Sequence, residues 1–200
     1  MKGFILISLA LFATVGQISA QSNPLLDVLD RVTEVYNEYE EFKHDSRFAM
    51  GDHIRHLSQL VLNVVLEEIT SWGLRVKQQC PHLRNTEAQG EIVRGCAESA
   101  VVAIAAHQDA IFDILEDMND ASNAVSLSTV EELVEFNVIT NYDDFNSHFD
   151  PIITEFRSRL TAYVAQVGQE IAGLAGITST LPDTTRACIN AAFQKFLQTC

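Results

Sequence analysis

The chain has 200 residues, and its 27 acidic side chains outnumber its 13 Lys and Arg, which gives a formal net charge of −14. Hydrophobic residues make up 47% of the chain and only 4 residues are proline, so a disordered, collagen-like or low-complexity protein is excluded. Because binding to a phosphate backbone needs a basic surface, the charge also argues strongly against nucleic acid as a partner.

The first twenty residues have the pattern of a secretory signal peptide. Lys2 precedes an apolar run over residues 4–15, which is too short to span a bilayer, and small residues end at Ala20. We expect cleavage after Ala20, so that residues 21–200 form one secreted helical domain; the alternative is a retained membrane anchor. No later apolar run is long enough to span a membrane, and the absence of an Asn-x-Ser/Thr sequon predicts no N-glycosylation.

Apolar residues then recur every three or four positions, which is typical of amphipathic helices, and no segment alternates with the period of a strand. The sequence predicts an all-α, single-domain bundle of five to six helices, stapled by two disulfides. Cys80-Pro81 is expected to end the second helix, and a capping-box pattern at Ser128–Glu131 to begin a new one after a loop. The expected helices lie at about 25–42, 50–79, 86 or 90 to 119, 128–140, 149–174 and 183–200.

Two of the expected helical segments have compositions that differ from an ordinary amphipathic helix. The third helix is apolar on nearly every side from Ala100 to Leu115, which predicts a central position in the bundle. Glycine and alanine are dense over residues 168–176, where they would allow another element to approach closely or would loosen the helix end.

Cys80, Cys96, Cys188 and Cys200 form an even set in a chain that we expect to be secreted, which predicts two disulfides. No Cys-x-x-Cys pair supports zinc or redox chemistry. In a continuous last helix, Cys188 and Cys200 would lie about 18 Å apart, well beyond the roughly 4.4–6.8 Å that a disulfide allows. Two crosswise pairings remain, and we favour Cys80–Cys188 with Cys96–Cys200 on the assumption that the third and last helices run parallel.

His107 is the most unusual single residue, because it shares the apolar seam of the third helix with Ile104 and Ile111. It could provide a polar contact inside a ligand cavity, or it could be a core histidine bonded to a buried partner. The candidate cavity residues are His107, Ile104, Ile111, Val64 and Phe156.

Other searches for chemistry find little. His53 and His56, and likewise Asp144 and His148, have spacings that could contribute to a metal site, but a polar helix start explains both. Residues 120–131 have the length of a calcium-binding loop and lack two of its required residues. We find no nucleophile, phosphate-binding or dinucleotide motif, so the sequence predicts no enzyme, no cofactor and no metal.

One resemblance covers about residues 25–120. The segment Tyr36-Asn37-Glu38-Tyr39-Glu40-Glu41-Phe42, followed by Cys80-Pro81-His82-Leu83 and Cys96, resembles insect secreted proteins that carry a tsetse EP-type domain. The resemblance implies an insect protein of gut, saliva or body fluid, without catalytic residues to carry over.

Two functions are therefore expected. The first is a secreted, non-enzymatic helical protein that binds a small apolar ligand or lipid in its core. The alternative is an extracellular, immune- or gut-associated interaction protein whose acidic surface binds a basic protein partner. A core cavity above about 300 Å³ would favour the first, and a filled core with an exposed apolar patch would favour the second. The sequence leaves the oligomeric state open.

Overall fold

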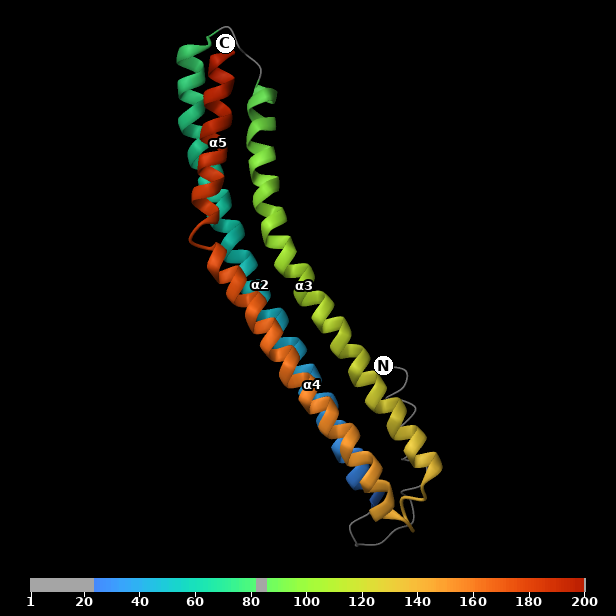
Figure 1. Cartoon of the computed structure of the whole chain (residues 1–200). Coiled ribbons are helices and arrows are strands. Elements are labelled where there is room, and N and C mark those ends of the chain that lie inside the picture. Colours follow the sequence, from blue (N-terminus) through green and yellow to red (C-terminus); the bar gives the residue numbers. More distant parts are fainter. Residues whose placement is uncertain (1–23, 82–85, 200) are drawn as a thin grey trace. The chain divides into compact units, whose positions relative to one another are not determined.

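The computed structural model describes residues 24–81 and 86–199, with only the backbone described for residues 86–89 (Figure 1). This part of the chain contains no strand, which confirms the all-α class. It contains four helices rather than five to six: α2 (Pro24–Gln79), α3 (Thr86–Glu135), α4 (Tyr142–Ile177) and α5 (Leu181–Gln198). The predicted signal peptide and Cys200 lie outside the described residues.

The structure confirms the helix ends that were predicted from proline and its neighbouring residues. Helix α2 begins at Pro24, whose fixed φ suits a first turn, and ends directly before Cys80-Pro81. Helix α3 begins at Thr86, the earlier of the two expected starts. Helix α5 begins at Leu181 with Pro182 in its first turn, close to the expected start.

The predicted break between residues 42 and 50 is wrong, because α2 continues through it. Residues 42–50 contain no proline and no glycine, and the next glycine along the chain is Gly51. Ser46 and Met50 are both buried, so they extend the core-facing row that begins with Tyr39 and Phe42. Burial of this row over successive turns outweighs the polar composition of the segment.

The predicted loop at 120–128 and the separate helix at 128–140 are also wrong, because both regions belong mainly to α3. Ala121, Ser122, Val125 and Thr129 are buried and continue the inward row. The Thr129 hydroxyl donates to the Val125 carbonyl oxygen at 2.7 Å, so the helix itself satisfies this buried polar group. Ser122 and Thr129 are thus core residues of a long helix, and the expected capping residue Ser128 lies half-buried within the same helix.

The chain divides into two compact units, each of which combines segments of three or four helices. Unit 1 comprises Met1–Ser46 and Phe112–Val167. In it, Arg31 donates to Asn146 at 3.0 Å and Arg157 donates to Glu38 at 2.9 Å, so α2 and α4 run parallel. The largest fully buried side chains of this unit are Phe145, Phe149 and Phe156. The predicted single domain over residues 21–200 stays a prediction.

Unit 2 comprises Arg47–Ile111 and Gly168–Cys200. Its α5 lies alongside the last turns of α2 (Figure 1), where the rings of Trp72 and Phe193 stack at 5.3 Å between centroids. The Trp72 indole N–H donates to the Asn190 side-chain oxygen at 2.8 Å. One apolar cluster joins α2, α3 and α5, and its buried members are Trp72, Val76, Cys80, Val93, Cys96, Ile189 and Phe193.

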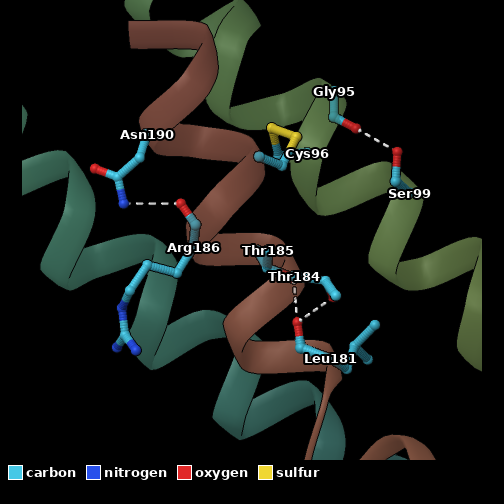
Figure 2. Close-up of a disulfide and its surroundings, with 9 residues drawn as sticks. Gly95, Cys96, Ser99, Leu181, Thr184, Thr185, Arg186 and Asn190 are labelled. Atoms are coloured by element: carbon cyan, nitrogen blue, oxygen red, sulfur yellow. Dashed lines mark hydrogen bonds between the residues drawn. A yellow bond between two sulfur atoms is a disulfide. The ribbon is translucent and has the colours of Figure 1, made fainter. Parts of the chain in front are cut away.

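A disulfide joins Cys96 of α3 to Cys188 of α5, with 5.8 Å between their Cα atoms (Figure 2). The favoured pairing of Cys80 with Cys188 and Cys96 with Cys200 is therefore wrong. The short turn after Ile177 does not reverse the chain, so α5 continues in the direction of α4 and runs antiparallel to α3 (Figure 1). Cys80 is also disulfide-bonded. The fourth cysteine, Cys200, lies outside the described residues.

Candidate functional site

His107 lies in unit 2, where its ring faces α4. The ring nitrogen Nδ1 lies 2.6 Å from Glu170 Oε2, and the two side chains are 29% and 31% exposed. Gly173 lies beside the ring, since a Cβ added there would be only 2.5 Å from His107 Cε1. The small residues of this segment thus give the histidine room to reach its carboxylate partner. The histidine is therefore bonded as expected, but the expectation of a core position with a buried partner is wrong, because both side chains are partly exposed at the helix surface. A role in a ligand cavity stays a prediction.

The other candidate cavity residues are buried, but they are divided between the two units. Val64, Ile104 and Ile111 belong to unit 2 with His107, whereas Phe156 belongs to unit 1. In unit 1, Phe156 lines a groove. We therefore treat the groove that Phe156 lines as a separate candidate site.

The glycines of α4 provide a matched pair for testing the His107 contact. We expect Gly168→Ala to raise the free energy of unfolding by about 1 kcal/mol, because alanine is the better helix former and nothing lies within 4 Å of the new Cβ. Gly173→Ala should lose most of this gain, since its Cβ displaces the His107 ring from Glu170. Urea unfolding of both variants checks this, and equal gains would contradict the close contact.

The groove of unit 1 lies between α3 and α4 and has a volume of about 220 Å³. Phe156 and Ile152 contribute apolar surface, and Glu155 and Arg159 form an ion pair on the same helix. A volume below about 300 Å³ is small for a whole lipid but suits one inserted side chain. The complete lining is Ala121, Ala124, Val125, Ser128, Ile152, Glu155, Phe156 and Arg159.

Most of the groove is formed by a part of the sequence that is rich in carboxylates and poor in basic residues. No Lys or Arg occurs between Arg94 and Arg157, whereas residues 95–156 contain thirteen Asp and Glu. Our sequence interpretation used only the net charge and did not identify this segment. The signal was available, because a count of basic residues along the chain reveals it.

In the described part of unit 1, each Lys and Arg side chain forms an ion pair with a carboxylate of α2 or α4. Arg157 illustrates this, since its hydrogen bond to Glu38 raises the pKa of the guanidinium although burial acts to lower it. No basic side chain of this described part is left for the carboxylates of α3. The pairs are Arg31–Asp150, Lys43–Glu40, Arg157–Glu38 and Arg159–Glu155.

Four exposed carboxylates, Asp113, Glu116, Asp117 and Asp120, follow one side of α3 at helical spacing. We call them the acidic face of α3, and none of them forms an ion pair with another described residue. Asp117 and Asp120 precede two groove residues, Ala121 and Ala124, by four positions each. They therefore lie on the side of α3 that borders the groove.

An apolar row continues from the acidic face toward the end of α3. Leu127, Val130 and Val134 follow one another at spacings of three and four, and Val134 is 83% exposed. Glu131 and Glu135 are exposed beside them. Unit 1 therefore combines a small groove, an exposed apolar row and unpaired carboxylates within one stretch of α3.

The metal candidates are not supported where the structure describes them. Among the described residues, no group of three or more His, Cys, Asp or Glu could hold a metal ion. Arg55 pairs with Asp52 at 3.9 Å next to His53, and the His148 ring packs on Phe136 at 4.7 Å between centroids. Residues 120–131 lie within the continuous helix α3, where they cannot form a calcium loop.

The sequence matches no protein-family model, and searches of curated proteins and of solved structures likewise gave no match. The resemblance to tsetse EP-type proteins therefore stays a prediction. None of the described helices is both long and apolar enough to cross a membrane.

Proposed function

We propose that this chain is a secreted, non-enzymatic protein that binds a basic protein segment at the groove between α3 and α4 of unit 1. The observation that carries the proposal is a small groove with a mixed apolar and polar lining, bordered on α3 by carboxylates that have no ion-pair partner among the described residues. A small pocket beside an acidic helix face fits a partner with one anchoring side chain and several Lys or Arg around it.

The groove and the acidic face of α3 would contribute differently to binding. The long aliphatic part of a Lys or Arg side chain can lie against Ile152 and Ala124 while its charged end reaches a carboxylate. Asp117 and Asp120 are exposed, so each pair with a cation is worth only about 0.2–1 kcal/mol and weakens with salt. We therefore expect the acidic face to govern the association rate and partner choice, and the groove to provide the anchor.

Secretion is part of the same proposal. The Cys96–Cys188 disulfide supports an oxidising compartment, as the predicted signal peptide does. The resemblance to insect secreted proteins favours a body fluid, saliva or the gut.

A synthetic amphipathic helical peptide of leucines and lysines, labelled for fluorescence anisotropy, tests the site. We expect the Asp117→Asn/Asp120→Asn variant to bind it about fivefold more weakly, which corresponds to about 1 kcal/mol for two exposed pairs. The matched control is Asp143→Asn/Asp144→Asn, which removes the same charge from the first turn of α4. Equal weakening in both variants would mean that only the net charge attracts the peptide, and would contradict the proposed site.

Native mass spectrometry of the protein secreted from eukaryotic cells separates this proposal from an apolar-ligand carrier. The interaction protein is expected to have the mass of the bare chain and to take up nothing from a lipid mixture. A stoichiometric lipid recovered by organic extraction would instead favour a carrier, and the residues around His107 would then be the first to mutate.

A further inference from the structure

One carboxylate oxygen of unit 1 is buried without a hydrogen-bond partner. Glu132 of α3 is partly exposed as a residue, but its Oε2 atom is buried and no described donor bonds to it. Among the buried and half-buried side chains that the structure describes, no other nitrogen or oxygen atom is in this condition. Because a buried carboxylate oxygen without a donor costs free energy, Glu132 would gain from a cationic partner.

Glu132 lies at one end of the groove between α3 and α4. It follows the groove residue Ser128 by four positions, which places it on the same side of α3, one turn beyond the groove lining. On α4 the lining ends at Ile152, and His148 lies one turn beyond it. The rings of Phe136 and His148 pack at 4.7 Å between centroids, so the two helices are in contact on the far side of Glu132. The carboxylate therefore lies between the groove and this ring pair.

The described part of unit 1 has no free cation for Glu132. No Lys or Arg occurs between Arg94 and Arg157 in the sequence, and each described Lys and Arg of the unit pairs with another carboxylate. Arg159 lines the opposite end of the groove, where it pairs with Glu155. The groove thus has a paired cation at one end and an unpaired carboxylate at the other. This polarity favours a basic side chain whose charged end points toward Glu132.

We propose that Glu132 selects the anchor of the partner: when a basic segment occupies the groove, the cationic end of one Lys or Arg side chain donates to Glu132 Oε2. This role rests on the function proposed above and adds the residue that recognises the anchor. Glu132 lies about 6 Å along the helix axis from Ser128. The stem of a lysine can therefore lie in the groove while its ammonium reaches the carboxylate.

The salt dependence of peptide binding tests this role, because salt screens a buried pair much less than an exposed one. With the leucine–lysine peptide used above, we expect Glu132→Gln to bind about tenfold more weakly than the wild type at about 0.05 M and at about 0.5 M salt alike. The loss caused by Asp117→Asn/Asp120→Asn should largely disappear at the higher salt. Circular dichroism confirms that the variants remain folded.

The matched control is Glu131→Gln, which removes the same charge from the neighbouring residue. Glu131 is exposed, so this change should weaken binding no more than about twofold at low salt. Urea unfolding of the free chain gives a second readout. Glu132→Gln should unfold at a higher urea concentration than the wild type, because a buried neutral amide costs less than a buried charge, whereas Glu131→Gln should not shift. A merely structural role for Glu132 would not combine greater stability with weaker binding.

Equal peptide affinities of Glu132→Gln and Glu131→Gln would overturn the role of Glu132. If Asp117→Asn/Asp120→Asn still weakened binding in that case, the groove would remain the binding site without this contact. A wild type that binds no peptide would overturn both proposals. A loss in Glu132→Gln that disappears at high salt would contradict a buried contact. Lower stability of the free Glu132→Gln chain would mean that the carboxylate is already bonded, and would also overturn the proposal.

Discussion

Replacing Cys96 and Cys188 by alanine is expected to lower the free energy of unfolding by about 4–5 kcal/mol. The disulfide joins residues separated by 92 positions, and closing so long a loop removes much of the conformational freedom of the unfolded chain. Alanine is the better replacement, because Cys96 is buried and a serine hydroxyl there would need a hydrogen-bond partner.

Guanidinium unfolding followed by fluorescence measures this loss. Trp72 is the one tryptophan of the chain and is buried in the same cluster as Cys96, so its emission reports on unit 2. The same wild-type protein, digested without reduction, should give a peptide that links Cys96 to Cys188. A loss below about 1 kcal/mol would contradict the chain-entropy explanation, and a Cys80–Cys188 peptide would contradict the pairing.

Replacing Phe193 by alanine is expected to lower the free energy of unfolding by about 3–5 kcal/mol, the range for removing a fully buried aromatic ring. Phe193 is almost completely buried and stacks on Trp72. Its removal leaves a cavity between α2 and α5 and exposes one face of the indole. The emission of the folded variant should therefore shift to longer wavelength.

Phe48→Ala is the matched control for this variant. Phe48 belongs to the same unit and is 69% exposed, so its removal should change the free energy of unfolding by less than about 0.5 kcal/mol. Similar losses in the two variants would mean that Phe193 does not pack as described. An unshifted tryptophan emission in Phe193→Ala would contradict the stacked pair.

The helix ends could be predicted because each depends on a few neighbouring residues. Proline fixes its own φ and restricts the residue before it, so Pro24 and Cys80-Pro81 determine where α2 begins and ends, whatever packs against it. Helix continuity over residues 43–49 and 120–128 could not be predicted in this way. There the buried Ser46 and Ser122 are compatible with a loop in isolation, and their burial selects the helix.

The candidate site was predictable only in part. The absence of Lys and Arg from residues 95–156 is a property of the sequence, and a charge count locates the acidic region. The groove depends on small side chains of α3 facing Phe156 and Ile152 of α4, which are distant in sequence. The apolar seam predicted a core position for His107, but its side chain is 29% exposed, and its partner Glu170 lies on another helix and required the tertiary structure.

The sequence by itself determined the helical class, the acidic character and the helix boundaries marked by proline, because periodicity, charge and φ restriction are local properties. Only the tertiary structure decided which cysteines pair. Cys96 meets Cys188 because the turn after Ile177 leaves α5 running in the direction of α4, and thus antiparallel to α3. The direction of a helix depends on which apolar surfaces it can bury, and burial is a property of the whole unit rather than of any one segment.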